Sequence, residues 1–316
     1  MKNKRYKIVA VGGGTGLSTL LRGLKRYDLD ITAVVAVSDD GGSSGRLRDE
    51  LGVLPPGDIR NCLVSLSEEE SLMTKLFQYR FPKKGTLYNH SFGNLFLTAL
   101  SSVSGGFDKA VSNASDVLAI KGKVLPVSLD NVKLNATLIN GKHVKGESKI
   151  SKSKSAISQV EICPKNAKVS KDVISSILNA DCVVIGPGSL YTSVIVNLLF
   201  DGFTAALKKT KALKVYICNI MTQVGETTGF SLSDHIKAIE KHSYAGVLDI
   251  ALVNNGKIAV PVVKRYAKEC SVPVQIDRKS YNNIQIIKKN FVSKNQYAHH
   301  DFAKLAETIF QLVKAR

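Results

Sequence analysis

The chain has 316 residues, of which 44% are hydrophobic and 22% charged, and its formal net charge is +18. This composition is ordinary for a globular protein, and no apolar stretch approaches the length needed to span a membrane. The basic residues are spread along the chain without aromatic interleaving and tryptophan is absent, which argues against a nucleic-acid partner. The positive charge itself could also attract an anionic membrane surface or phosphorylated small molecules.

The cysteines and the N-terminus indicate the compartment. The five cysteines are scattered without a Cys-x-x-Cys pair, a pattern typical of reduced and mostly buried thiols. The basic N-terminal segment runs into a short apolar stretch that ends in glycines, so we interpret it as a first β-strand and not as a signal peptide. We therefore expect a cytoplasmic protein.

The first part of the chain predicts a β-α-β unit. A continuous apolar run at residues 6–11 predicts a strand buried on both faces, and the leucine spacing of residues 18–27 predicts a helix. A second buried strand is expected at 31–37, parallel to the first and joined to it by a right-handed crossover. Helices are expected next at 58–66, 72–81, 94–103 and 109–120.

Residues 124–162 differ from the rest because apolar and polar residues alternate there, around the hairpin signal Asn140-Gly141. We expect a small β-rich insert in which the Ser/Lys stretch 148–158 is an exposed loop. The α/β pattern then returns, with strands expected at 180–185, 213–220 and 247–253. Helices are expected at 174–180, 193–208, 234–241 and 301–314, the third with a capping box from Ser231 to Asp234.

This order predicts a Rossmann-like three-layer α/β/α fold with a mainly parallel sheet, in a single domain over residues 1–316. In such sheets, ligands bind outside the carboxyl ends of the strands. The first strand ends in a glycine-rich turn that enters a helix, a potential anion site, although a tight turn without ligand is the alternative. Leu17 replaces the third glycine of the dinucleotide fingerprint, and no Gly-Lys-Ser/Thr follows. The residues concerned are Gly12, Gly13, Gly14, Thr15 and Gly16.

Two adjacent aspartates, Asp39 and Asp40, follow the second strand. Asp39 could bind a ribose hydroxyl, or both carboxylates could hold Mg²⁺ together with phosphate oxygens. Alternatively, Asp40 only begins a turn through its side chain. The glycines after the pair would let the backbone approach a phosphate closely. The candidate ligand-binding residues that follow the pair are Gly42, Ser43, Ser44 and Arg46. Arg46, Arg48 and Arg60 are candidates to balance phosphate charge, and for Arg48 a solvated face is the alternative.

Two later strands end in further polar turns. One is followed by Gly188, Ser189 and Thr192, and the next ends at Asn219. Three anion-competent loops on one sheet edge suggest a ligand with more than one phosphate. His90, just before a helix, could be an acid/base group, a phosphate contact or a capping residue. His299 and His300 lack metal-ligand partners at useful spacing.

Long sequence blocks carry a family resemblance. They are GGGTGLSTLLRGLK, VSDDGGSSGRLRDELGVLPPGDIRNCL, NHSFGNLFLTAL, IGPGSLYTSVIVNLL and CNIMTQVGETTGFSLSDHI. Together they resemble the YvcK-like gluconeogenesis factors, a family related to CofD, the transferase that makes a phospholactyl deazaflavin coenzyme. By motif match, the resemblance implies a site lined by Gly13, Gly14, Thr15, Gly16, Asp39, Asp40, Ser43, Ser44, Asn61, Asn94, Gly188, Ser189 and Asn219.

The resemblance implies a cytoplasmic protein that binds UDP-sugars, notably UDP-N-acetylglucosamine, and that is needed for cell shape and growth on gluconeogenic carbon sources. No turnover is established for that family. A CofD-like, Mg²⁺-dependent phospholactyl transferase or phosphotransferase and an NAD-dependent oxidoreductase are the alternatives, with Asp39, Asp40 and His90 as catalytic candidates. Mg²⁺ is the only cofactor these residues suggest. We expect a homodimer, the usual default, and a protein partner in cell-wall or carbon metabolism.

Overall fold

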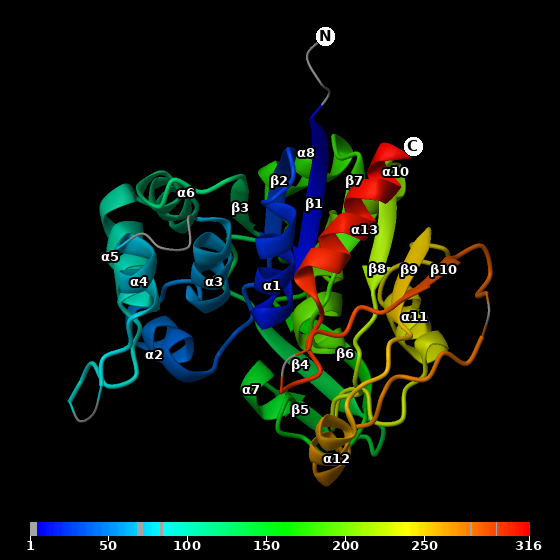
Figure 1. Ribbon diagram of the computed structural model, residues 1–316. Helices are drawn as coiled ribbons and strands as arrows, with labels where there is room; N and C mark the ends of the chain where they lie inside the picture. Colours follow the sequence, from blue (N-terminus) through cyan, green and yellow to red (C-terminus); the bar gives the residue numbers. More distant parts are fainter. Residues whose placement is uncertain (1–4, 68–71, 83–84, 279, 295) are drawn as a thin grey trace.

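The main sheet of the computed structural model has seven strands, all parallel, in the order β10-β9-β8-β7-β1-β2-β3 (Figure 1). The structure describes residues 5–67, 72–82, 85–278, 280–294 and 296–316. The strand order reverses between β1 and β7, as in Rossmann-like folds, which confirms the predicted fold class. The strands are β1 Tyr6–Gly12, β2 Leu29–Val35, β3 Lys123–Pro126, β7 Cys182–Ile185, β8 Leu213–Ile217, β9 Ile250–Asn254 and β10 Gln285–Lys289.

The central strands are apolar throughout because helices cover both faces of the sheet. Ile8 of β1, for example, is fully buried between Ile31 of β2 and Cys182 of β7. Glycine at position 23 lets two covering helices cross closely, since a Cβ there would lie 2.3 Å from the Phe302 carbonyl oxygen. Helices α1 (Gly14–Leu24), α3 (Gly57–Leu66) and α13 (Phe302–Lys314) pack on the front face in Figure 1, and α8 (Lys171–Leu178) and α10 (Phe203–Lys209) lie behind it.

A group of helices packs beside the β3 edge, at the left of Figure 1. Its core includes Phe77, whose ring is fully buried and lies 5.1 Å from that of Phe96. One of these helices begins at a side-chain cap, because Ser91 Oγ accepts the Asn94 N–H. The group comprises α2 (Gly42–Leu51), α4 (Leu72–Gln78), α5 (Phe92–Ser104) and α6 (Phe107–Val117).

A three-stranded antiparallel sheet, β5-β4-β6, lies at the end of the molecule where the main strands finish (Figure 1). The turn at Asn140-Gly141, with φ of +80° at Gly141, joins its first two strands, which confirms the predicted hairpin. The short helix α7 (Glu147–Ile150) follows, and Ile150 is fully buried. The expectation of an exposed loop at 148–158 was therefore wrong for residues 148–150, and also for 157–158, where β6 begins. The strands are β4 (Lys133–Leu138), β5 (His143–Lys145) and β6 (Ile157–Cys163).

Other elements depart from expectation at particular residues. Because β3 pairs with β2, the first residues of the expected insert belong to the main sheet. The helix expected at 193–208 is divided at Gly202, which has φ of +91°. The capping box from Ser231 to Asp234 is confirmed at the start of α11 (Leu232–Lys241). Before Gly202 the chain forms the π-helical turn η1 (Leu190–Ile195) and α9 (Val196–Leu198). Three elements were not predicted: α2, α12 (Val260–Lys268) and β10.

The sequence also led to expectations about membrane spans, cysteines and domain organisation. No helix in the described residues is both long and apolar enough to cross a membrane. All five cysteines are free; Cys62, Cys182 and Cys218 are buried, whereas Cys163 and Cys270 are exposed. The division into a single domain over residues 1–316 stays a prediction.

Candidate functional site

The glycine turn after β1 is closed by a carboxylate from another helix. The Gly14 N–H, at a residue with φ of +62°, donates to Oδ2 of Asp58 at 2.6 Å. A Cβ at Gly13 would lie 2.9 Å from the same oxygen, so glycine is needed for this approach. Part of the anion site expected at the start of α1 is therefore taken by Asp58, which the sequence analysis did not single out. Burial raises the pKa of Asp58 to about 6, and the charge of Asp39 adds to the effect.

The two adjacent aspartates accept hydrogen bonds from different parts of the chain. Asp39 Oδ1 accepts the Gly41 N–H at 2.9 Å, so Asp39, and not Asp40, makes the local turn bond. Burial raises the pKa of Asp39, partly offset by the bonds from Gly41 and Ser44. Asp40 Oδ1 instead accepts the Ser148 N–H at 2.8 Å and so ties α7 to the end of β2.

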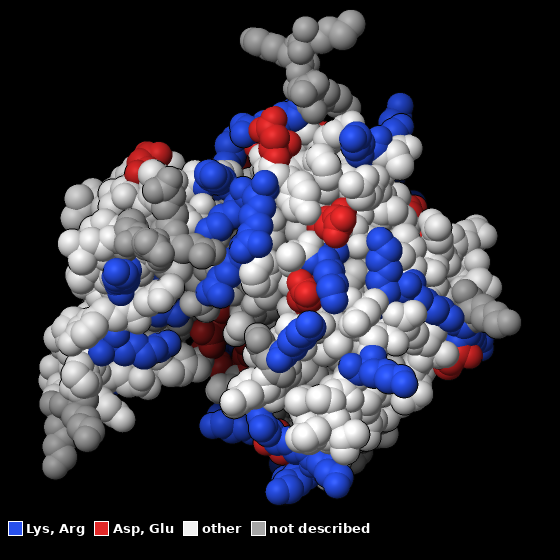
Figure 2. All heavy atoms as spheres, in the orientation of Figure 1, with Lys and Arg blue, Asp and Glu red and all other residues white. Residues whose placement is uncertain are grey.

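A cavity of about 410 Å³, here called the polar pocket, opens beside Asp39 and Asp58. The first turns of α2, α3 and α5 all reach it. Figure 2 shows Asp and Glu atoms in the hollow between the α2–α6 helices and the rest of the molecule, with Lys and Arg on its rim. The pocket is lined by Asp39, Gly41, Gly42, Ser43, Ser44, Gly57, Asp58, Arg60, Asn61, Arg80, Asn89 and Asn94.

His90 contacts this pocket through Ser43. The Ser43 hydroxyl lies 2.9 Å from His90 Nδ1 and accepts from Asn94 Nδ2 at 3.1 Å. Burial and the charge of Arg46 lower the pKa of His90, so its imidazole is neutral near pH 7 and can accept the Ser43 proton. His90 is not the cap of α5, because Ser91 has that role.

Two of the candidate arginines lie outside the polar pocket. Arg48 is 3% exposed, so it is not part of a solvated face, and its guanidinium donates to the carbonyls of Ser38, Asp39 and Val132 and to Asn131 Oδ1. It therefore ties α2 to the end of β2 and to the start of the small sheet. Arg46 is partly exposed, and its Nη2 donates to the Tyr88 carbonyl at 2.6 Å. Neither lines the cavity.

A second cavity, of about 290 Å³, opens where the strand order reverses; we call it the switch-point pocket. The two strand-end loops touch here, since a Cβ at Gly16 would lie 2.3 Å from the Pro187 carbonyl oxygen. Asn219 Nδ2 donates to the Gly188 carbonyl at 2.8 Å. The lining residues are Thr15, Gly16, Thr19, Pro187, Gly188, Asn219, Ile220, Met221, Thr222, Gln223, Tyr266, Ala298, His299 and His300.

The hydroxyl residues after β7 mainly hold the neighbouring loop. Ser189 Oγ donates to Gln223 Oε1 at 2.8 Å. Thr192 Oγ1 and the Tyr191 N–H donate to the two oxygens of Glu226, at 2.9 and 3.1 Å. Burial raises the pKa of Glu226. Ser189 and Thr192 do not line the switch-point pocket; they hold the 223–226 loop, of which Gln223 is a lining residue.

The predicted site residues therefore divide into three sets. The switch-point pocket holds four of them and the polar pocket holds seven, while the others lie outside both linings. The first set is Thr15, Gly16, Gly188 and Asn219. The second is Asp39, Gly42, Ser43, Ser44, Arg60, Asn61 and Asn94, and the third is Gly12, Gly13, Gly14, Asp40, Arg46, Arg48, His90, Ser189 and Thr192.

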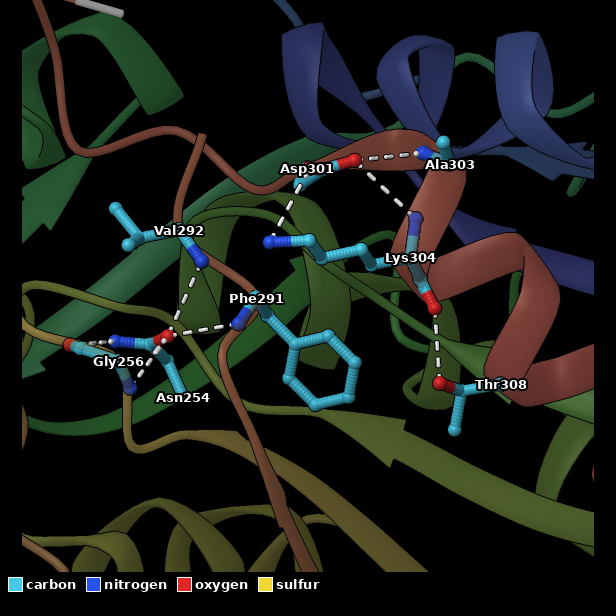
Figure 3. A network of polar contacts seen from close by, with 8 residues as sticks. All are labelled: Asn254, Gly256, Phe291, Val292, Asp301, Ala303, Lys304 and Thr308. Atoms are coloured by element: carbon cyan, nitrogen blue, oxygen red, sulfur yellow. Dashed lines mark hydrogen bonds and ion pairs between the residues drawn. The ribbon is translucent and has the colours of Figure 1, made fainter. Parts of the chain in front are cut away.

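The β10–α13 connection supplies one wall of the switch-point pocket and is fixed at both ends (Figure 3). Asn254 Oδ1, at the end of β9, accepts the N–H groups of Phe291 and Val292 at 2.9 and 3.1 Å. Asp301 Oδ1 caps α13 by accepting the N–H groups of Ala303 and Lys304. His300, between these anchors, lies 3.1 Å from the Cys218 carbonyl through Nε2, and burial lowers its pKa to about 4.

Metal chemistry has limited support from the side chains. Within the described ranges, no group of three or more His, Cys, Asp or Glu residues is arranged to hold a metal ion. Asp39 and Asp58 both line the polar pocket, and crowding of their charges contributes to the raised pKa of Asp58. These two carboxylates fit Mg²⁺ only if a ligand supplies the remaining oxygens, as phosphates do. Asp40, bonded to α7, would not be one of the two.

Comparison with known proteins shows to which family the chain belongs. The family described as "2-phospho-L-lactate transferase CofD" matches residues 8–292. The gluconeogenesis factor of Bacillus subtilis is 45% identical over 98% of this chain and 99% of that one, and that of Halalkalibacterium halodurans is 46% identical over 98% of this chain and 97% of that one. The chain belongs to the CofD-related family of YvcK-like gluconeogenesis factors.

A solved structure supports this family and its fold. An X-ray crystal structure of a protein from Bacillus halodurans superimposes with a TM-score of 0.94 at 46% identity, covering 97% of this chain and 100% of that one. The resemblance inferred from the sequence blocks is confirmed. Most lining residues of both cavities belong to those blocks; Arg80 of the polar pocket and Tyr266 and residues 298–300 of the switch-point pocket do not.

Proposed function

We propose that this gluconeogenesis-factor homologue is a regulatory protein that binds a nucleotide sugar of the UDP-N-acetylglucosamine type. The switch-point pocket carries the proposal, because it combines apolar surface with amide and hydroxyl groups at the place where Rossmann-like sheets bind nucleotides. Ile220, Met221 and Tyr266 offer surface for a base, and Thr222 and Gln223 offer polar groups.

The diphosphate would follow the contact between the two glycine loops. At Gly16 and Gly188 the backbone is exposed to the cavity without side chains in the way, so a phosphate can approach closely. Growth on gluconeogenic carbon sources and cell shape would depend on this binding. Residence in the cytoplasm, a homodimer and a protein partner in cell-wall or carbon metabolism belong to the same proposal.

Calorimetric titration of the full chain with UDP-N-acetylglucosamine, with and without Mg²⁺, tests the proposal when the recovered ligand is analysed by mass spectrometry. We expect binding without Mg²⁺ and an intact ligand. Tyr266→Ala removes a flat surface from the pocket and should weaken binding by about ten-fold, since stacking on a base contributes roughly 1–3 kcal/mol. Tyr88→Ala, at a tyrosine that is 54% exposed and outside the pocket, is the control. Absence of binding by the parent protein would refute the proposal.

A CofD-like transferase is a second candidate, favoured by one specific observation. The carboxylates of Asp39 and Asp58 share the polar pocket next to the glycine turn, where Mg²⁺ and ligand phosphates could complete a site. Conversion of the ligand only when Mg²⁺ and an acceptor are present would support this alternative. In the part of the chain that the structure describes, no comparable observation favours an NAD-dependent oxidoreductase.

A further inference from the structure

One side chain of the switch-point pocket carries a free hydrogen-bond acceptor. His300 lines the pocket, and its ring Nε2 lies 3.1 Å from the Cys218 carbonyl oxygen. A carbonyl oxygen only accepts, so Nε2 carries a proton and donates it. Burial lowers the pKa of His300 to about 4 in spite of this bond, so the ring is neutral near pH 7. Nδ1 is then unprotonated and acts only as an acceptor.

This Nδ1 atom is left for a ligand. Within the described residues, the ring of His300 makes a hydrogen bond only through Nε2. Nδ1 is also not one of the fully buried polar atoms that lack a partner, so it stays accessible. Since His300 lines the pocket, a bound molecule can reach the atom. A ligand that pairs with Nδ1 has to bring an N–H or O–H group.

The position of His300 is fixed by contacts within the protein. The bond to the Cys218 carbonyl sets the orientation of the ring. Asn254 holds the chain before His300, and the Asp301 cap of α13 holds the chain after it (Figure 3). An acceptor held in this way discriminates between ligands, because it cannot turn to suit a different group.

The surroundings of His300 suit a base better than a phosphate. The diphosphate of a nucleotide sugar offers only acceptor oxygens, which an unprotonated nitrogen repels. Ala298, two residues before His300, forms an apolar cluster with Ile220 and Met221, and Tyr266 packs against this cluster. These four residues line the same pocket and offer a surface for a flat ring. The group that meets Nδ1 is therefore expected on the edge of the base.

A second side chain of the pocket offers a donor. Gln223 Oε1 accepts the Ser189 hydroxyl at 2.8 Å, which leaves the amide Nε2 to donate. Nε2 has no partner in the part of the chain that the structure describes, and Gln223 lines the pocket. The two free groups match the edge of uracil, where the N3–H lies between two carbonyls. In cytosine, N3 carries no hydrogen and would face Nδ1 with a second lone pair.

We propose that His300 selects the base of the bound nucleotide, because its Nδ1 accepts the N3–H of uracil while Gln223 Nε2 donates to a neighbouring carbonyl of the same ring. This inference rests on the proposed nucleotide-sugar function and adds to it the group that distinguishes uracil from cytosine. His300 is then a specificity-determining residue of the switch-point pocket.

Calorimetric titration of the full chain with UDP and with CDP tests the selection. The two nucleotides share ribose, charge and ring size and differ at the edge of the base. We expect UDP to bind at least about ten-fold more tightly, because CDP leaves Nδ1 unpaired. Equal affinities would overturn this inference and leave the proposed function intact. Absence of binding of UDP, CDP and UDP-N-acetylglucosamine would refute the proposed function, and this inference with it.

His300→Gln removes the acceptor but keeps a donor for the Cys218 carbonyl, since the amide nitrogen can take the place of Nε2. The UDP affinity should fall at least about ten-fold, to that of CDP, while the CDP affinity stays. His143→Gln, at an exposed histidine of β5 outside the pocket, is the matched control and should change neither. An unchanged preference for UDP in His300→Gln, or an equal loss for both nucleotides, would contradict the inference.

A measurement on the parent protein does not depend on the folding of any variant. In the complex with saturating UDP, the uracil N3–H should give a protected imino signal in the proton NMR spectrum, because a hydrogen bond inside the pocket slows its exchange with water. Absence of that signal from the complex would overturn the inference.

Discussion

Single carboxylates hold the strand-end loops together, and each belongs to a different long-range contact. Asp58 bonds to Gly14, Asp40 to Ser148 of α7, and Glu226 to Thr192. Glu147 accepts a hydrogen bond from the Ser38 hydroxyl at 2.8 Å, and burial raises its pKa well above the usual range. Burial raises the pKa of Asp58, Glu226 and Glu147, so folding shifts these three acids toward their protonated forms.

Asp58→Asn tests this preference through the pH dependence of stability. The pKa of Asp58 is raised from 3.8 to about 6 on folding, so protonated Asp58 favours the folded state at low pH. That contribution is lost as the pH rises from about 4 through about 6, and it amounts to at most about 3 kcal/mol. The variant, neutral at all pH values, lacks it. From pH 4 to pH 7, urea unfolding should show a larger loss of unfolding free energy for the parent than for Asp58→Asn. Equal changes in the two proteins would mean that Asp58 has an ordinary pKa.

Arg48→Met tests a buried guanidinium that holds backbone instead of a ligand. The substitution leaves the carbonyls of Ser38, Asp39 and Val132 without their donor, and each buried acceptor left unsatisfied costs roughly 1–3 kcal/mol. Arg46→Met, at a partly exposed arginine on the same helix, should cost less than about 1 kcal/mol and serves as the control. Equal effects in denaturant unfolding would contradict the structural role of Arg48.

At the scale of elements, the strands and the helices that cover them were predictable from local pattern. The strands are continuous apolar runs because helices bury both faces of the sheet. The helix at 193–208 was predicted as one piece, since the spacing of its apolar residues continues across the break at Gly202. Helix α2 was missed because Gly41, Gly42 and Gly45 resemble a loop, although a Cβ at Gly45 would lie 2.1 Å from the Asp40 carbonyl, so glycine is required there by packing.

The candidate site was predictable only where a loop follows a strand. Four predicted residues line the switch-point pocket because strand ends meet at one edge of a parallel sheet. Asp58 was missed because an acid in a first helical turn is common and its bond to Gly14 spans 44 residues of sequence. Tyr266 and His300 were missed as site residues for a similar reason: their segments reach the pocket through tertiary packing that no local pattern records.

Gly16→Ala tests the contact between the two strand-end loops. The new Cβ would lie 2.3 Å from the Pro187 carbonyl oxygen, which is backbone and cannot move aside easily. We expect a loss of unfolding free energy of roughly 1–3 kcal/mol, the usual cost of overpacking. Gly12→Ala is the matched control, because its Cβ would be 3.5 Å from its nearest neighbour, an ordinary contact. Similar thermal unfolding of the parent and Gly16→Ala would contradict this close packing.

At the scale of the whole molecule, the small sheet and the main sheet meet over the acids after β2. The Ser148 N–H donates to Asp40, and the Ser38 hydroxyl to Glu147, so both bonds link α7 to the end of β2. The surface carries the excess positive charge, whereas the hollow beside the site is acidic (Figure 2). The net positive charge therefore attracts anions of any kind, and discrimination among them depends on the residues that line the cavities.

Asp40→Ala should loosen the small sheet without unfolding the main one. Loss of the bond to Ser148 removes roughly 1–2 kcal/mol from the contact, so amide exchange in α7 and β4 should accelerate by about 5–30-fold. Exchange in β1 and β7 should be unchanged. Asp28→Ala, at an exposed aspartate paired with Arg5, is the control. Faster exchange throughout the protein would indicate that Asp40 supports the main sheet as well.

The β10–α13 connection has a consequence for biosynthesis. Residues 298–300 form one wall of the switch-point pocket, yet they follow every strand of the main sheet in the chain, and they are positioned when α13 packs against α1. On the ribosome, the glycine loop of Thr15 and Gly16 emerges long before this wall exists. A nascent chain that lacks α13 therefore lacks this wall, and the pocket is complete only once synthesis has passed through α13.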